Sequence, residues 1–293
     1  MGEGWGEVKE KTMSRRKRSL PRGWYPFDGK DCKREIESYL EGWSPSQSLS
    51  AVGVGGIVPH AGWYFSGKLT AKVFSYLGSK RKIEVVVLYG GHLGPEDLPL
   101  IVTEEACETP FGDMVVHQDF VKSLMKRIDL EKESPSSGDN TIEVQLAIVK
   151  YFLPEAKLLA LRSPLSQKAV ALGEEVAKIS QEEGISILAV GSTDLTHYGP
   201  NYGFLVKGVG PSSVEWVKKE NDKGFIDRAL RMDTEGLLKH AQENDSACSA
   251  GAAASAIATC KALGAEKGVL LDYYTSYDIL PGESFVGYAG ILF

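Results

Sequence analysis

The sequence predicts an α/β protein with a mainly parallel central sheet and helices on both faces of that sheet. Short apolar segments rich in β-branched residues alternate along the chain with longer segments of helical periodicity. This alternation is typical of parallel strands joined by crossover helices. No linker-like change in composition divides residues 19–293, which we therefore expect to form a single domain.

The first residues of the chain differ from the rest. Residues 1–18 are polar and charged and end in the basic run RRKR at residues 15–18. Such a run can serve as an arm for nucleic acid or membranes, but it is more often a solvated tail. The sequence therefore predicts a disordered tail over residues 1–18.

Several segments have the composition of strands. The runs IEVVVLY at residues 83–89 and ISILAV at residues 185–190 are almost entirely apolar, which is typical of strands buried on both faces. Strands are expected at residues 51–58, 83–89, 98–103, 156–161, 185–190, 268–277 and 284–293.

Longer segments between them favour helices. The helix expected at residues 66–77 places Leu69, Val73 and Leu77 on one face, with Ser66 as its N-cap. The segment at residues 213–239 is expected to break near Asp233. Helices are expected at residues 30–40, 66–77, 119–128, 141–153, 166–183, 213–239 and 248–263. The last is rich in Ala and Ser, and such small side chains allow a neighbouring element to approach closely.

Composition limits the function. The chain has 293 residues with a net charge of −6 and a pI of about 5.5. This argues against nucleic acid as a partner, because phosphate binding needs concentrated Lys and Arg. No apolar run approaches the roughly 20 residues that span a bilayer, and the charged N-terminus lacks an apolar signal region. The scattered cysteines fit a reducing cytoplasm rather than a disulfide scaffold: Cys32, Cys107, Cys248 and Cys260.

Three of the five histidines follow predicted strands within a few residues: His60, His92 and His197. Parallel strands end at one edge of a sheet, so these imidazoles can converge there. Two neutral histidines and one anionic group, with open coordination positions, suit non-haem Fe(II), and zinc accepts the same ligands. The sequence therefore predicts a metal site at this edge. The other histidines, His117 and His240, fall in expected surface segments.

The residues alone leave the anionic group open. Asp194 lies in the same loop as His197. Cys248 opens a helix, and a helix N-terminus lowers the pKa of a thiol. Glu143 is a third candidate, with the alternative that its carboxylate only interacts with the first turn of its own helix.

The segment PHAGWYFSG at residues 59–67 resembles the signature of the Memo family, whose prokaryotic members are also called AmmeMemoRadiSam system protein B. The resemblance covers the chain from about residue 20 to the C-terminus. Motifs similar to those of the family occur at residues 24–26 (WYP), 109–113 (TPFGD), 141–146 (TIEVQL), 192–199 (STDLTHYG), 248–251 (CSAG), 274–276 (YTS) and 286–288 (VGY).

The resemblance implies a fold like that of the catalytic subunit of class III extradiol ring-cleavage dioxygenases. In that superfamily two histidines and a glutamate hold Fe(II), and a further histidine acts as acid and base. By motif, His60 and His92 correspond to the metal histidines, and Cys248 takes the place of the glutamate. His197 corresponds to the acid/base group, and Asp194 to a neighbour that binds the metal or orients a ligand.

The chain departs from the family pattern near this site. The usual Gly-Pro-Ser-His is Tyr-Gly-Gly-His at residues 89–92, and the histidine often found before the Leu-Glu-Val-Gln helix is Asn140. The closing Ser-Gly-Asp is Ser-Tyr-Asp at residues 276–278. These changes leave the expected metal ligands in place and alter residues expected to contact a substrate.

Two main interpretations follow. The first is a metal-dependent oxidoreductase, in which Fe(II) holds a substrate oxygen and O₂ while His197 moves protons. A thiolate ligand such as Cys248 shifts the preference towards copper or zinc. The second is a non-catalytic protein that binds a metal or a peptide in the same cleft, as described for animal members of the family. A zinc hydrolase is a third interpretation. The expected ligand is a small molecule or a peptide, and the sequence indicates no oligomeric state.

Overall fold

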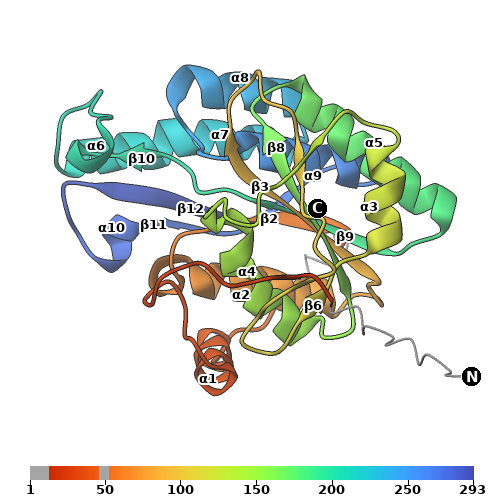
Figure 1. Ribbon diagram of the computed structural model, residues 1–293. Helices are drawn as coiled ribbons and strands as arrows, with labels where there is room; N and C mark the ends of the chain where they lie inside the picture. Colours follow the sequence, from red (N-terminus) through yellow and green to blue (C-terminus); the bar gives the residue numbers. More distant parts are fainter. Residues whose placement is uncertain (1–12, 46–52) are drawn as a thin grey trace, which may run out of the picture.

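The computed structural model describes residues 13–45 and 53–293, in which helices cover both faces of a central sheet (Figure 1). β11 (Val269–Thr275) pairs with β12 (Phe285–Leu292), next to the edge formed by β10 (His197–Tyr198). The described strands of the sheet run in the order β10 (His197–Tyr198), β12 (Phe285–Leu292), β2 (Gly55–Val58), β9 (Ile187–Ser192), β3 (Val85–Leu93), β8 (Lys157–Pro164), β4 (Leu100–Ile101) and β7 (Glu131–Lys132).

The sheet is mixed, so the prediction of a mainly parallel sheet holds for its centre only. Its centre is parallel, because β2 pairs with β9 and β3 pairs with both β9 and β8 in that direction. However, β12 pairs antiparallel with β2, β10 and β11, and β4 pairs antiparallel with β8. The chain returns from β11 to β12 through the short helix α10 (Ser276–Ile279), and antiparallel neighbours need no longer crossover.

Aspartate side chains begin several of the helices. Asp28, Asp139 and Asp233 each accept a hydrogen bond from a backbone N–H in the first turn of a helix. The cap at Asp233 lies where the sequence predicts a helix break. The described helices around the sheet are α1 (Gly29–Tyr39), α2 (Trp63–Gly78), α3 (Gln118–Met125), α4 (Asn140–Phe152), α5 (Gln167–Glu183), α6 (Pro211–Trp216), α7 (Asp222–Leu230), α8 (Thr234–Asn244) and α9 (Ala250–Ala262).

The start of α2 differs from the prediction. Gly62 is its N-cap, and Ser66 lies inside the helix, where its hydroxyl donates to the carbonyl oxygen of Ala61 at 2.6 Å. Intrahelical bonding begins at Trp63, so α2 starts three residues after His60. The histidine therefore lies in a tight connection between β2 and α2.

Small residues let α9 approach its neighbours closely, as its composition predicts. A Cβ atom at Gly173 of α5 would lie 2.3 Å from the carbonyl oxygen of Ser255 in α9. A Cβ atom at Gly191 of β9 would lie 2.7 Å from the carbonyl oxygen of Ala252. Both contacts are with backbone, so the glycines are needed for this packing. The result is that the start of α9 lies against the end of β9.

Residues 13–18 are not a free tail. β1 (Arg15–Arg16) pairs in parallel with β5 (Ala106–Cys107), which pairs with β6 (Met114–Val115) in a separate small sheet. The segment is held because Arg15 pairs with Asp113 at 2.5 Å and Arg16 with Glu104 at 3.2 Å. This differs from the disordered tail predicted for residues 1–18, of which residues 1–12 lie outside the described part of the chain. Residues 51 and 52 of the strand predicted at 51–58 lie outside it as well.

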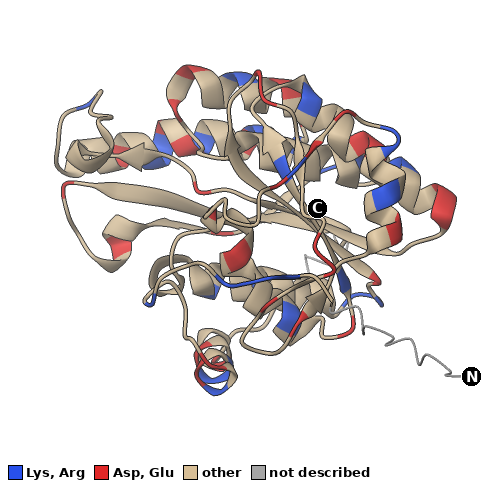
Figure 2. Ribbon diagram, viewed as in Figure 1, with Lys and Arg blue, Asp and Glu red and all other residues tan. Residues whose placement is uncertain are grey.

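Charged residues of both signs are distributed over the outer helices (Figure 2). The basic residues of segment 15–18 cross the front of α4 in the same view. Within the described ranges, no helix is both long enough and apolar enough to cross a lipid bilayer.

Candidate metal centre

Three potential metal ligands come together at the carboxyl ends of the central strands. His60 follows β2, His92 lies in the irregular end of β3, and Cys248 lies just before α9. The rings of His60 and His92 are 5.2 Å apart between centroids and nearly perpendicular. The Sγ atom of Cys248 is 3.1 Å from Nε2 of His60. One nitrogen of each histidine and the Sγ atom lie within 4.8 Å of one another, and we call this set the His₂Cys cluster.

Two glycines bring His92 into the cluster. A Cβ atom at Gly90 would lie 2.2 Å from Oγ1 of Thr141, at the start of α4. Gly91 has a φ of +94°, and a Cβ atom there would lie 2.8 Å from Cβ of Arg162 in β8. Only glycine meets both requirements without strain, so the end of β3 can run close to α4 and β8. The Tyr-Gly-Gly-His departure from the family pattern falls at this crowded point.

Backbone contacts place Cys248 opposite His60. The N–H of Cys248 donates to the carbonyl oxygen of Asp194 at 3.2 Å, and the N–H of Ser249 donates to Oγ1 of Thr193 at 3.0 Å. The sequence predicted that Cys248 opens the helix. Ser249 is the N-cap of α9, so Cys248 instead precedes it. The loop after β9 therefore holds the cysteine, at a point separated from His60 by 188 residues.

The electrostatics of the cluster favour a thiolate. Burial by itself raises the pKa of Cys248, but the charge and hydrogen bond of His60 outweigh it, and the pKa falls well below its usual value. Burial lowers the pKa of His60, but the Cys248 thiolate and the Asp194 carboxylate raise it to about 9. The thiolate is the form of cysteine that binds metals. The contact of 3.1 Å between Sγ of Cys248 and Nε2 of His60 stabilises the thiolate.

Asp194 supports His60 from outside the cluster. Its Oδ1 atom accepts a hydrogen bond from the backbone N–H of His60 at 2.6 Å. Its Oδ2 atom lies 3.9 Å from Nε2 of His60, and burial raises the pKa of this carboxyl. The family resemblance left two roles open for Asp194, metal binding and orientation. This contact supports the second role, the orientation of His60.

His197 lies at the cleft but not in the cluster. It belongs to β10, where it pairs with Val286 of β12. Its ring packs edge-on against Tyr202, with 5.0 Å between the centroids. His197, His60 and His92 line the same cleft of about 480 Å³. This position suits proton transfer to a ligand in the cleft better than direct metal binding.

Glu143, the third candidate for the anionic ligand, faces away from the cluster. Its carboxylate accepts hydrogen bonds from the N–H and hydroxyl of Ser19, the N–H of Leu20 and the hydroxyl of Tyr25, at 2.7 to 3.0 Å. The residue therefore fastens the N-terminal segment to α4. The two histidines that were not candidates for the metal site have structural contacts as well. His117 caps α3, and His240 bonds to the carbonyl oxygen of Asn221.

Polar and apolar side chains share the lining of the cleft beside the cluster. Among the residues that the structure describes, none of those lining it is a lysine or an arginine. Asn140 lines the cleft and donates to the carbonyl oxygen of His60 at 3.0 Å. The apolar part of the wall is formed by Trp24, Ala61, Phe65, Leu280, Pro281, Val286 and Tyr288.

The sequence analysis missed two residues that support the cluster. The Oδ2 atom of Asp139 lies 3.3 Å from Nδ1 of His92, and the hydroxyl of Ser192 lies 3.4 Å from Nδ1 of His60. Asp139 adjoins the TIEVQL motif, and Ser192 opens the STDLTHYG motif, so both were within reach of motif reasoning. Their contacts depend on the separation of neighbouring strands, for which the sequence has no direct signal.

The donor set fits a transition metal. Two imidazoles and a thiolate are borderline to soft ligands, which suit iron, copper or zinc, whereas Mg²⁺ and Ca²⁺ require oxygen atoms. His60 is 2 % exposed, so the cluster is shielded on one side, while His92 is exposed to the cleft. Three protein ligands next to an open cleft leave positions for a further ligand.

The fold and the cluster together define a class: α/β proteins in which two histidines at the carboxyl ends of parallel strands meet a cysteine just before the start of a helix. Residues 16–292 match the family model described as "Memo-like protein", and the chain belongs to the Memo family.

Similar proteins cover almost the whole chain. A MEMO1 family protein of Nitrosopumilus maritimus is 30% identical over 282 residues, which are 92% of this chain and 96% of that protein. One of Methanococcoides burtonii is 28% identical over 273 residues, again 92% of this chain and 96% of that protein. Among solved structures, an uncharacterized protein of Escherichia coli K12 is similar with a TM-score of 0.46 and 14% identity, over 80% of this chain and 98% of that chain.

Proposed function

We propose that this protein binds one transition-metal ion through His60, His92 and Cys248 and uses it in a redox reaction on a ligand in the adjoining cleft. The observation that carries the proposal is the His₂Cys cluster, whose three ligand atoms lie within 4.8 Å of one another. Iron(II) is the expected ion, and copper and zinc are the alternatives that a thiolate ligand favours.

The surroundings of each ligand support the proposal. Nδ1 of His92 faces Asp139, which leaves Nε2 for a metal. Nε2 of His60 faces Cys248, whose lowered pKa holds sulfur in the ligating form. Protons compete with the metal for both histidines, so the affinity is expected to fall as the pH falls.

The residues around the cleft divide the remaining tasks. A bound iron or copper ion supplies open coordination positions and one-electron chemistry. His197 can accept or donate a proton at its imidazole nitrogens, beside the ring of Tyr202. Phe65, Val286 and Tyr288 offer apolar contact to a ligand on this side of the cleft. The described lining contains no lysine or arginine but includes Asn140, Ser276 and Ser284, so the ligand that fits best is held by the metal, by hydrogen bonds and by apolar contact.

Metal analysis tests the proposal directly. The wild-type protein is expected to retain close to one equivalent of metal after loading and desalting, and His60→Ala and Cys248→Ser are expected to lose most of it. His197→Gln is expected to keep its metal, because His197 lies outside the cluster. His117→Asn is a matched control, because His117 caps a helix and asparagine keeps a hydrogen-bond acceptor at that position. Equal metal content in wild type and His60→Ala would refute the assignment.

Oxygen consumption separates catalysis from binding. Protein loaded with iron under anaerobic conditions is mixed with catechol-like substrates and then with oxygen. Uptake that His197→Gln abolishes without loss of metal supports an oxidoreductase. Full metal content without uptake favours the non-catalytic alternative, in which the cleft holds a metal and a small molecule or peptide.

A further inference from the structure

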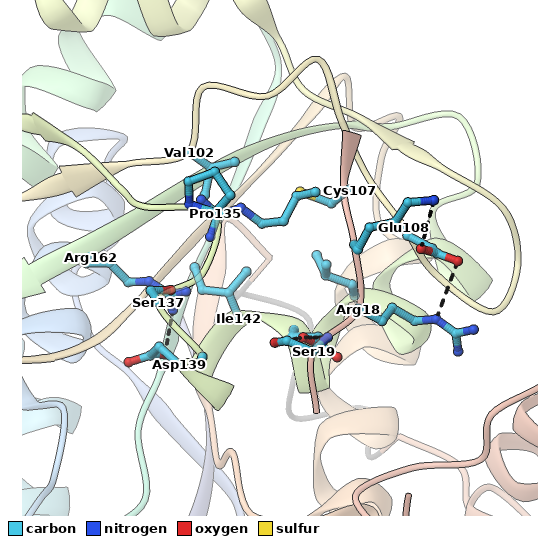
Figure 3. A pocket seen from close by; sticks show the side chains of 15 residues that line it. Arg18, Ser19, Val102, Cys107, Glu108, Pro135, Ser137, Asp139, Ile142 and Arg162 are labelled. Carbon is cyan, nitrogen blue, oxygen red and sulfur yellow. Dashed lines mark hydrogen bonds and ion pairs between the residues drawn. The ribbon is translucent and has the colours of Figure 1, made fainter. Parts of the chain in front are cut away.

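A chain of ion pairs, buried at its centre, runs from the N-terminal strand to the metal centre. Arg16 of β1 donates from Nη1 to Oε1 of Glu133 at 2.8 Å. Glu133 accepts from Nη2 and Nε of Arg162 at 2.9 and 3.0 Å, and Nη1 of Arg162 donates to Oδ1 of Asp139 at 2.7 Å. Figure 3 shows the dashed bond between Arg162 and Asp139. The second oxygen of Asp139 faces Nδ1 of His92 at 3.3 Å.

The two oxygens of Asp139 have different tasks. Oδ1 accepts from Arg162 and from the N–H and hydroxyl of Thr141, so it is committed to donors at the start of α4. Oδ2 is therefore the atom that remains for His92. The side chains of Glu133 and Arg162 are 1 % and 5 % exposed, so this arrangement is held in a medium where ion pairs are strong. Arg162 and Thr141 thus fix the orientation of the Asp139 carboxylate on the side away from His92.

The charges of this chain favour an N–H group at Nδ1 of His92. Its carboxylates are Glu104, Glu133 and Asp139, against the guanidinium groups of Arg16 and Arg162. The excess of one negative charge lies in a network that ends at His92. An ionised carboxylate accepts hydrogen bonds but cannot donate them, so the proton of a neutral His92 lies on Nδ1 and the lone pair on Nε2.

We propose that Asp139 is a positioning residue that fixes the tautomer and ring orientation of His92, so that Nε2 is presented to the metal. The inference rests on the proposed metal site. Metal-binding histidines commonly donate their second N–H to a carboxylate, and loss of that partner costs roughly 10- to 100-fold in metal affinity. Asp139 lies one residue before α4, next to the TIEVQL motif but outside it.

Asp139→Asn reverses the polarity of the contact without changing its shape. The amide oxygen is expected to take the place of Oδ1, because Arg162 and the N–H of Thr141 both require an acceptor there. The amide N–H₂ then faces His92 and donates to Nδ1, which moves the histidine proton to Nε2, the atom needed by the metal. Zinc affinity, measured by competition with a chelator, is expected to fall by about 100-fold, the upper end of the usual range.

Asp139→Ser distinguishes positioning from a merely structural role. Serine is a good N-cap but is too short to reach His92, so it neither accepts from Nδ1 nor donates to it. Its zinc affinity is expected to fall by about 10-fold, less than in Asp139→Asn, although serine is the larger change in shape. Asp233→Asn, at the cap of α8, is the matched control and is expected to leave zinc affinity unchanged.

Long-range ¹H–¹⁵N spectra of the histidines provide a readout independent of metal binding. Hydrogen bonds to Asp139 and Cys248 raise the pKa of His92 to about 10, so the spectra are recorded as a pH titration. In the neutral form of His92, Nδ1 is expected to carry the proton in the metal-free wild type and Nε2 in Asp139→Asn. Zinc affinity that is unchanged in Asp139→Asn, or lower in Asp139→Ser than in Asp139→Asn, would overturn the inference. If the wild type binds no zinc, the proposed function fails, and the spectra of the metal-free proteins still decide the role of Asp139.

Discussion

Glu143 offers a test of whether the N-terminal segment is part of the folded unit. Its carboxylate accepts four hydrogen bonds, two from Ser19, one from Leu20 and one from Tyr25. The substitution Glu143→Ala removes all of the acceptors and leaves the donors of the segment without a partner on α4. The segment would then be held by β1, by the ion pairs of Arg16 and by the contacts of Trp24 and Tyr25 with Trp63.

The magnitude follows from the burial of the bonds. A hydrogen bond to a charged group contributes about 1.5 to 3 kcal/mol when water cannot replace it. The bonds from Leu20 and Tyr25 are partly buried, whereas the two from Ser19 are exposed and contribute little. Two bonds at the lower value give a loss of about 3 kcal/mol in the free energy of unfolding. With a slope of about 3 kcal/mol per M, the urea midpoint falls by about 1 M.

Urea unfolding, limited proteolysis and metal analysis together provide the assay. Glu143→Ala is expected to unfold at lower urea concentration and to be cleaved faster within its first 25 residues, while its metal content stays equal to that of the wild type. Glu155→Ala, which removes an exposed glutamate just after α4, is the control and is expected to change nothing. An unchanged midpoint would refute the anchoring role, and a loss of metal would return Glu143 to the candidate ligands.

Two further predictions concern stability. Burial raises the pKa of Asp222 to about 7, although hydrogen bonds from Thr196 and Tyr273 oppose the shift. The folded protein then holds a proton that the unfolded chain releases, so stability declines as the pH rises from about 4 to 7. Asp222→Asn is expected to flatten this decline when melting temperatures are measured against pH. Parallel curves of melting temperature against pH for the wild type and the variant would contradict the prediction. Gly173→Ala is expected to lower the free energy of unfolding by about 1 to 3 kcal/mol, because its Cβ atom would lie 2.3 Å from the carbonyl oxygen of Ser255. An unchanged melting temperature would show that α5 and α9 can separate freely.

The sequence was informative wherever local pattern and motif order sufficed. The apolar runs located β3, β8 and β9 within a few residues, because strands buried on both faces need an unbroken apolar composition. The break expected near Asp233 coincides with a helix cap, because aspartate bonds the free N–H groups of a helix start. The ordered motifs indicated the Memo family, which the family match over residues 16–292 confirms.

Where the sequence was misleading, distant parts of the chain had intervened. The basic run at residues 15–18 resembles a solvated tail, yet Arg16 pairs with Glu104 and Glu133, about 90 to 120 residues away. The sheet is mixed because the final strand, β12, inserts beside β2 in antiparallel direction. Neither pairing has a local signal, since each depends on which segments become neighbours after folding.

By itself, the sequence determined the α/β character of the chain, its family and the histidines that follow the strands, because these depend on composition and on residues close together in the chain. Only the tertiary structure decided which groups meet. The residues alone left Asp194, Cys248 and Glu143 open as partners of the histidines, and the family resemblance favoured Cys248. The packing of α9 against β9 brings the Sγ atom of Cys248 to His60, while Glu143 is turned towards the N-terminal segment. Convergence of this kind depends on distances between segments, and a one-dimensional pattern contains no such distances.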